Sequence, residues 1–412
     1  MIKRPRPSGS NALLVLVVLI GINLRPFLTA IGPLAGEIDA QLALGMDRLA
    51  WVTLLPLLLI GVGVLLTPAL LDKTGPRPVL GTALLLLMLG SALRFDLASG
   101  ALLIASAALC GLGSALVQGV LPGLIKRAFA GKVPLVMGIF SACMMGGGAL
   151  GAVLTPRVAV YLDWSRALAL WSLPVLLALL WLGWRVRLPA AAQHSPVSGE
   201  QRLIALPRAW LLIACFGIIN SGYGIVVAWL APAYLVLGWS PQQGGELVAW
   251  LALAQTVSGL GLPLLAARKL DRRPWMGLAI VMQVAGFGGL WLAPEVAPIL
   301  WCLLCGAGLG GSFSLIMVIA LDHLPDPRRA GSLSALMQGF GFILAATGPW
   351  VAAHLHHLSS DFASAWQWQL GGLALMSLLV LHLDPRHYAR VMRQPAAPVS
   401  QRGQTAQSNT PA

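Results

Sequence analysis

The sequence predicts an all-α integral membrane protein with 12 transmembrane helices arranged as two pseudo-symmetric bundles of six helices. Three observations support this prediction: the composition, the length of the apolar runs and the distribution of basic residues between loops. Hydrophobic residues make up 58% of the 412 positions and charged residues 10%, whereas soluble chains carry about 25% charged residues. Most apolar runs reach the roughly 20 residues that a helix needs to cross a bilayer, and they lack the short alternation of β-barrel strands.

The first half contains six apolar runs, each of which is expected to form one membrane span. They cover residues 12–36, 49–71, 79–97, 99–125, 134–156 and 164–184. Polar or charged breaks separate the runs, and in order they contain Asp47-Arg48, Asp72 to Arg77, Asp96 to Gly100, Lys126 to Lys132 and Arg157 to Asp163. Charged and Pro/Gly-rich segments of this kind are costly within lipid, so we expect them to end each helix at the membrane surface.

The second half repeats this pattern with six further runs. They cover residues 208–236, 246–266, 275–293, 296–321, 331–353 and 363–383. The breaks between them contain, in order, Gly238 to Gly245, Arg268 to Pro274, Pro294-Glu295, Pro325 to Arg329 and Ser359 to Asp361. The two halves together give the predicted total of 12 spans.

Basic residues fall mainly on one side of this arrangement. Of the 27 lysines and arginines, 22 lie in the tails, the middle loop and the loops on the same side. Four lie on the opposite side, namely Arg48, Arg94, Arg157 and Arg166, and Arg25 lies within a span. Because cytoplasmic loops are enriched in basic residues, we expect both termini and the middle loop in the cytoplasm. The chain is therefore predicted to cross the cytoplasmic (inner) membrane of a bacterium.

The longest polar break between spans divides the chain into two bundles. The predicted units are a cytoplasmic tail (1–11), the first bundle (12–188), a cytoplasmic linker (189–207), the second bundle (208–385) and a disordered cytoplasmic tail (386–412). The halves match at offsets of 197 to 199 residues, in the pairs Asn23 and Asn220, Trp51 and Trp250, Asp72 and Asp271, and Gly111 and Gly308. Parallel repeats of this kind are typical of carriers that bind their solute between the halves.

The loop after the second span is similar to a loop motif of the major facilitator superfamily. It reads Pro68-x-x-x-Asp72-Lys73-x-Gly75-Pro76-Arg77, and the copy after the eighth span keeps Asp271-Arg272-Arg273. The prolines depart from the superfamily pattern, which has glycine and arginine in their places. The resemblance implies a major facilitator fold and a gating role for Asp72, Gly75, Arg77 and Asp271.

The chain more specifically resembles the cyanate transporter (CynX/NimT) family of that superfamily. The segments that carry the resemblance include Gly21-Ile-Asn-Leu-Arg25-Pro26 with Thr29, Gln118 with Leu121-Pro122, Pro134-Leu-Val-Met-Gly138, Asn220-x-Gly222-Tyr223, Gly306-x-Gly-Leu-Gly-Gly311 and Met337-Gln338-Gly339. The resemblance implies a carrier for cyanate or a related small solute. The family also includes proposed nitroimidazole exporters, so the solute and the direction of transport remain open.

Arg25 is the most informative single residue because it lies within an apolar run. The nearest carboxylate along the chain is Glu37, at the far end of the same run. A charge at that depth costs about 2.5–3.5 kcal/mol on insertion scales, so the guanidinium is expected to face the protein interior or a wet cavity. It either pairs with a carboxylate of another span or holds an anion from solution. Pro26, which has no backbone N–H, is expected to bend or break the span beside the charge.

Several uncharged polar side chains also lie within spans and are expected to line the same cavity. They are Asn23, Thr29, Gln118, Asn220, Tyr223 and Gln338. The alternative is that they hydrogen-bond between helices and only strengthen packing. The glycine runs at Gly146–Gly148 and Gly306–Gly311 are expected to allow close helix contact across a moving interface.

Other classes of function lack their signatures in this sequence. All five cysteines lie within apolar spans, where they are expected to pack, and neither a metal site nor a cofactor site is expected. The basic residues are scattered through loops and do not predict nucleic-acid binding. No Walker A sequence and no catalytic constellation of an intramembrane enzyme is visible. We therefore expect a non-enzymatic, monomeric carrier of a small anion working by alternating access, with an exporter of small drugs as the alternative.

Overall fold

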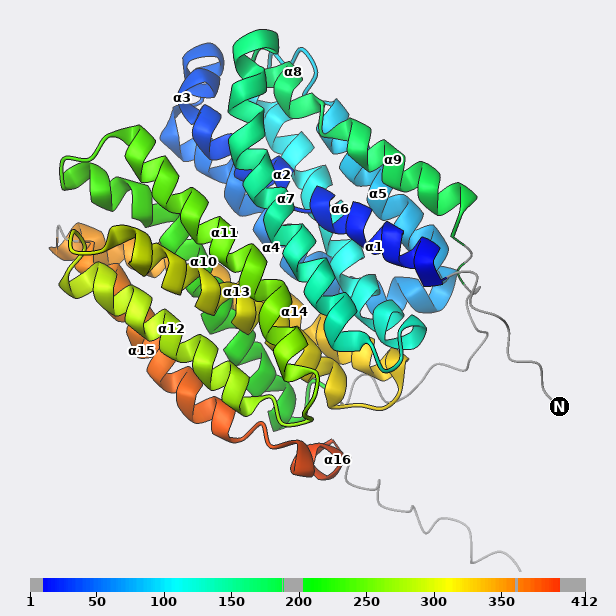
Figure 1. Cartoon of the computed structure of the whole chain (residues 1–412). Helices are drawn as coiled ribbons and strands as arrows, with labels where there is room; N and C mark the ends of the chain where they lie inside the picture. The colour runs from blue at the N-terminus through cyan, green and yellow to red at the C-terminus, as the bar shows by residue number, and fades with distance from the viewer. Residues whose placement is uncertain (1–9, 187, 189–202, 360–361, 393–412) are drawn as a thin grey trace, which may run out of the picture.

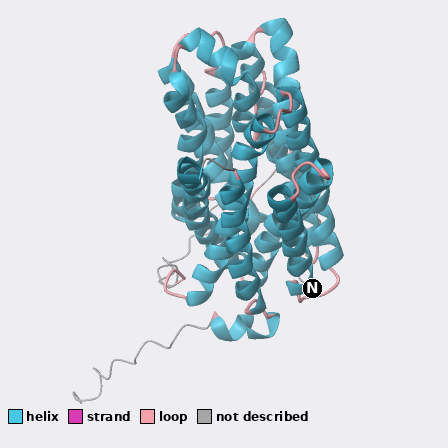
Figure 2. Cartoon of the chain, turned by 90° about the vertical axis from the view of Figure 1, so that its left-hand side faces the viewer, coloured by secondary structure: helices cyan, strands magenta, loops and turns pink. Residues whose placement is uncertain are grey.

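The computed structural model describes residues 10–186, 188, 203–359 and 362–392, and within these ranges the chain forms helices and short connections without strands (Figure 2). The N-terminal residues 1–9, most of the predicted linker and the tail from residue 393 lie outside the described ranges. The predicted all-α membrane fold is confirmed. Ten of the described segments are long and apolar enough to cross a membrane, and one further apolar helix is shorter.

The first bundle contains the helices up to residue 184. They are α1 (Ser10–Asn23), α2 (Pro26–Thr29), α3 (Ile31–Leu42), α4 (Gly45–Thr74), α5 (Pro76–Ala92), α6 (Gly100–Ala128), α7 (Val133–Leu162), α8 (Trp164–Ala169) and α9 (Ser172–Trp184). Helices α1–α3 together form the first predicted span, and α8 with α9 form the sixth. The shorter apolar helix is α5, which has 17 residues.

The second bundle repeats this order with fewer interruptions. Its helices are α10 (Pro207–Val236), α11 (Pro241–Ala266), α12 (Arg273–Leu292), α13 (Pro298–Asp322), α14 (Pro327–Ser359) and α15 (Ala363–Leu381), followed by the 3-10 turn η1 (Pro385–His387) and α16 (Tyr388–Val391). Five of these helices begin at or beside a proline, whose missing N–H costs nothing in the first turn.

The two bundles lie side by side and meet along a few helices (Figure 1). Helix α4 packs against α14, and α7 packs against α11 and α13, so each contact joins one helix from each half. Helix α13 is the most buried candidate span, because 83% of an apolar stretch of 18 residues in it is buried. Large apolar side chains on the outer faces of α9, α12 and α15 are exposed, as expected for helices that face lipid.

The orientation of this fold in the membrane gives a first testable prediction. A cysteine introduced at Ser198 is expected to resist a membrane-impermeant maleimide in intact cells and to react after permeabilisation. The matched control is Ala98→Cys, in the loop between α5 and α6, which is expected to react in intact cells. The prediction is based on the 22 basic residues on one side. Reaction at position 198 in intact cells would contradict the predicted topology.

Candidate substrate site

The first span is broken at Arg25, and Pro26 explains the break. Helix α1 ends at Asn23 and α2 begins at Pro26, so Leu24 and Arg25 lie between two helices (Figure 1). In an unbroken helix the carbonyl of Ile22 would accept a hydrogen bond from residue 26, but proline has no N–H to donate. Arg25 has a non-helical backbone with φ −122° and ψ −20°. The predicted interruption beside the charge is therefore present, and Arg25 lies in the non-helical segment between α1 and α2.

Helix α7 packs closely on this break because it presents glycines to it. A Cβ atom added to Gly147 would lie 2.1 Å from the carbonyl oxygen of Ile22, and one added to Gly151 would lie 2.7 Å from the Cα of Pro26. The hydroxyl of Thr29 donates to the carbonyl of Gly148 over 2.7 Å. The glycines thus allow backbone contact with the broken segment, and Thr29 fastens α2 to α7.

Arg25 reaches across to the second bundle. Its Cζ lies 4.6 Å from the centroid of the Tyr223 ring, which is carried by α10. Cation–π contacts of this kind are worth about 0.5–2 kcal/mol. Both side chains are partly exposed, and among the described residues no carboxylate forms an ion pair with Arg25. The alternative of a buried partner carboxylate therefore receives no support from the described part of the chain.

Helix α6 contacts both the broken segment of the first bundle and helix α14 of the second bundle. The hydroxyl of Ser114 donates to the carbonyl of Leu24 over 3.4 Å. Gln118 lies one helical turn further along α6. Its backbone carbonyl accepts a hydrogen bond of 3.2 Å from the side-chain amide of Gln338 in α14. The side chain of Gln338 also contacts Ser334. Gln118 and Gln338 are thus brought together across the two bundles, as Arg25 and Tyr223 are.

The two asparagines of the repeat occupy corresponding positions in their helices. Asn23 donates to the carbonyl of Leu19 over 2.7 Å, and Asn220 donates to the carbonyl of Phe216 over 2.9 Å. Each bond therefore closes on the asparagine's own helix, four residues earlier. The Oδ1 atom of Asn23 is buried without a hydrogen-bond partner. Burial of such an oxygen costs free energy unless a donor hydrogen-bonds to it. Because Asn23 lies two residues from Arg25, this unpaired acceptor belongs to the same part of the chain as the guanidinium.

The bundles are joined at the ends that are predicted to face the cytoplasm. Lys126, near the end of α6, donates to the carbonyls of Leu321 and Leu324 at the end of α13. Asp72, at the end of α4, forms an ion pair with Arg328 at the start of α14. These contacts cross from one bundle to the other, so this side of the protein is closed.

The remaining predicted gating residues make contacts within one bundle. Gly75 has a positive φ of 82° at the turn between α4 and α5, a conformation that favours glycine. Arg77 donates to the carbonyl of Gly183 over 3.0 Å, within the first bundle. Asp271 pairs with Arg273 over 2.8 Å, within the second, and this hydrogen-bonded partner holds the pKa of the Asp271 carboxyl below its usual range. The gating role of these residues stays a prediction.

The closed side yields a second testable prediction. Lys126→Gln removes the cation that bridges α6 to α13, and a hydrogen bond to a charged group is worth about 1.5–3 kcal/mol. We expect a cysteine at Ser334, on the closed side of α14, to react about tenfold faster with a thiol reagent applied from the cytoplasm. The matched control is Lys132→Gln, which removes an exposed lysine of the next loop. Equal reaction rates in both variants would contradict the prediction that the hydrogen bonds of Lys126 hold the two bundles together on this side.

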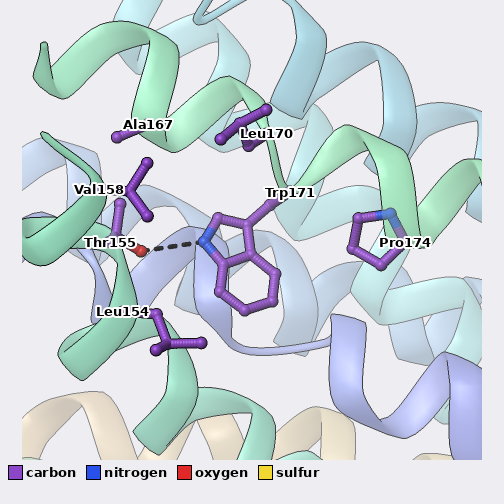
Figure 3. Close-up of a pocket in the computed structure, with 7 residues that line it drawn as sticks. All are labelled: Leu154, Thr155, Val158, Ala167, Leu170, Trp171 and Pro174. Atoms are coloured by element: carbon purple, nitrogen blue, oxygen red, sulfur yellow. Dashed lines mark hydrogen bonds between the residues drawn. The ribbon is translucent and has the colours of Figure 1, made fainter. Parts of the chain in front are cut away.

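A separate pocket of about 200 Å³ lies between α7, α8 and α9 (Figure 3). Its lining is apolar except where the indole N–H of Trp171 donates to the hydroxyl of Thr155 over 2.9 Å. None of the predicted site residues lines this pocket. Its apolar lining does not favour a charged solute. We take the group around Arg25 as the candidate site, because there a cation without an ion-pair partner among the described residues lies between the bundles.

Two residues with informative contacts were not among the predicted site residues. Lys126 is a basic residue of the break after the fourth predicted span, yet it bridges the bundles. Arg94 was counted as a loop residue on the outer side, yet only 1% of it is exposed. Its position within the run 79–97 was the available signal, because a charge inside an apolar run needs a buried partner.

Comparisons with known proteins agree with this architecture. The model of the Major Facilitator Superfamily matches residues 13–349 and 237–404. The chain is 38% identical to the cyanate transport protein CynX of Escherichia coli (strain K12) over 373 residues, which cover 90% of this chain and 96% of that protein. It is 32% identical to the 2-nitroimidazole transporter of the same organism over 378 residues, 90% and 95% of the two chains.

Among solved structures, the proton:xylose symporter XylE matches with a TM-score of 0.77 and 13% sequence identity, over 91% of this chain and 96% of that chain. At this identity the likeness concerns the fold alone. The sequence relatives are much closer and extend over nearly the whole length of both chains. This protein therefore belongs to the cyanate transporter (CynX/NimT) family of the major facilitator superfamily.

Proposed function

We propose that this transporter moves a small monoanion, cyanate in the first place, across the cytoplasmic membrane by alternating access. The observation that carries the proposal is the state of Arg25. Its guanidinium lies between the bundles against Tyr223, and no described carboxylate pairs with it. A cation in that position is costly, and a bound anion would relieve the cost.

The geometry of the contact leaves the right atoms free for an anion. The contact with Tyr223 places the guanidinium carbon over the face of the ring, with Cζ 4.6 Å from the ring centroid. The N–H donors of arginine lie in the plane of the group and form a fork that matches small anions. Among the described residues no hydrogen bond from the Arg25 side chain to the protein is formed, so these donors remain for a solute. A linear monoanion satisfies them without needing a large cavity.

The contacts between the bundles support alternating access. The ion pair of Asp72 with Arg328 and the bonds of Lys126 close the predicted cytoplasmic side. A carrier closed on this side admits its solute from the other side, and release inward requires these contacts to separate. Because the group around Arg25 contains residues of both bundles, movement of one bundle against the other would change the site itself.

A second candidate is transport of a nitroaromatic compound. One relative is named a 2-nitroimidazole transporter, and the same two residues offer a suitable arrangement. A planar ring would stack against Tyr223, and the oxygens of a nitro group would accept hydrogen bonds from Arg25. This candidate therefore uses the same site with a neutral solute.

A ligand panel distinguishes the two candidates. The melting temperature of the purified protein is measured with sodium cyanate, sodium thiocyanate, sodium chloride and 2-nitroimidazole, because a ligand of the folded state raises it by mass action. The proposal predicts a saturable rise with cyanate that persists at constant ionic strength. A rise with 2-nitroimidazole and none with the anions would favour the second candidate and overturn the first. Uptake of labelled cyanate by proteoliposomes then tests transport directly.

A further inference from the structure

Arg94 is a buried cation of the first bundle. It lies just after α5, between Leu93 and Phe95, and only 1% of it is exposed. Its Nε atom donates to the hydroxyl of Ser106 over 3.0 Å, and its Nη1 atom donates to the carbonyl of Phe27 over 2.9 Å. The Nη2 atom is buried without a partner. Arg94 therefore joins α5, α6 and α2 through a single guanidinium.

No described carboxylate compensates this charge. Asp96 lies two residues away along the chain, but it pairs with Arg166 over 2.8 Å. Asp163 also pairs with Arg166. A buried charge without an opposite charge is costly even when it is hydrogen-bonded, and a neutral side chain of similar size would avoid the cost. The partners of the Arg94 hydrogen bonds indicate which structural role could offset this cost.

The carbonyl that Arg94 contacts belongs to the broken segment that carries Arg25. Phe27 is the second residue of α2, a helix of four residues that is followed by a separate helix at Ile31. On the other flank of α2, Thr29 is bonded to Gly148 of α7. The short segment is thus held from two sides, by α7 through Thr29 and by the end of α5 through Arg94. Both contacts lie within four residues of Arg25.

We propose that Arg94 is a positioning residue: it anchors α2 through the Phe27 carbonyl and thereby sets the direction of the Arg25 guanidinium toward Tyr223 and the solute. This inference rests on the proposed function of Arg25. Arg94 does not touch the solute, because it is fully buried and its bonds go to the protein. Loss of a group that orients a ligand typically costs about 10- to 100-fold in affinity at metal sites. We expect a loss of similar kind here.

The first test separates affinity from folding. Initial uptake of labelled cyanate by proteoliposomes is measured for wild type, Arg94→Lys and Arg94→Met, per folded carrier. Lysine donates to the Phe27 carbonyl or to Ser106 but lacks the fork that joins both. We expect the half-saturation concentration to rise about tenfold in Arg94→Met and less in Arg94→Lys. The matched control is Arg166→Lys, whose half-exposed arginine pairs with Asp96, two residues from Arg94, and it should leave half-saturation unchanged. A lower melting temperature with unchanged half-saturation would overturn the positioning role.

The second test does not depend on the solute. Arg25→Cys places a thiol at the site, and its rate of reaction with a small methanethiosulfonate is compared with and without Arg94→Met. The half-buried Cys143 is replaced by Ala in both backgrounds. If Arg94 anchors α2, the rate at position 25 changes several-fold when Arg94 is replaced. An unchanged rate overturns the inference even if the anion proposal holds, whereas a changed rate supports it even if cyanate is not carried.

Discussion

Replacement of Arg25 by Ala is expected to abolish transport of an anion while the protein still inserts and folds. The change removes the fixed charge and the donors that the site offers to an anion. Truncating one partner of a desolvated charge pair costs about 2–5 kcal/mol, which corresponds to at least 30-fold in affinity. Arg25→Lys keeps the charge but loses the planar fork of donors, so an intermediate loss is expected. Initial uptake of labelled cyanate by proteoliposomes measures both effects.

A folding control is essential for these variants because arginines also stabilise structures. Monodisperse elution in detergent and a melting temperature near that of wild type show that each variant is folded. Arg157→Ala, which removes an exposed arginine near the end of α7, controls for loss of positive charge. Wild-type uptake by a folded Arg25→Ala protein would show that Arg25 does not hold the solute.

Gly147→Ala is expected to cause the second large effect, although it adds only one methyl group. The new Cβ would lie 2.1 Å from the carbonyl oxygen of Ile22, which belongs to the backbone and cannot rotate away. Either α7 or the end of α1 must move, and overpacking of this kind costs about 1–3 kcal/mol. Since Arg25 follows Ile22 by three residues, the same movement displaces the guanidinium. We expect a lower melting temperature and a weaker stabilisation by cyanate.

The neighbouring glycine provides the matched control for this variant. A Cβ on Gly146 would meet the Thr256 side chain of α11 at 3.5 Å, an ordinary contact distance. Alanine also favours a helix over glycine at either position by about 1 kcal/mol. Gly146→Ala is therefore expected to be neutral or slightly stabilising, with cyanate stabilisation retained. Equal behaviour of the two variants would mean that close packing at Gly147 does not position Arg25.

The fold was predictable because two physical signals are strong in this chain. Long apolar runs identify the spans, and the distribution of basic residues predicts which loops share a side. The break at Arg25 was also predictable, because Pro26 cannot donate a backbone hydrogen bond. The second interruption, at Ala30 between α2 and α3, has a similar signal in the sequence, because Pro33 in the first turn of α3 cannot donate a hydrogen bond to the carbonyl of Thr29.

The partners of individual residues were harder to predict, because periodicity does not show which helix faces which. The glycines of Gly306–Gly311 were expected at the moving interface. Gly306 and Gly310 instead pack on Leu251 and Gln255 of α11, within the second bundle. The sequence predicted that Arg25 and Tyr223 line one cavity, but residue type alone did not predict the direct contact between two residues almost 200 positions apart. Such contacts depend on how the bundles dock, and only the three-dimensional arrangement reveals them.

The most direct test of the central claim is equilibrium binding of labelled cyanate to the purified carrier, with wild type and Arg25→Gln compared at constant ionic strength. Glutamine keeps hydrogen-bonding capacity and removes the charge. The account predicts saturable binding to wild type, competition by thiocyanate, and at least a 30-fold weaker affinity in a folded Arg25→Gln protein. Saturable binding with the same dissociation constant in both proteins would contradict the claim that Arg25 holds the anion between the bundles.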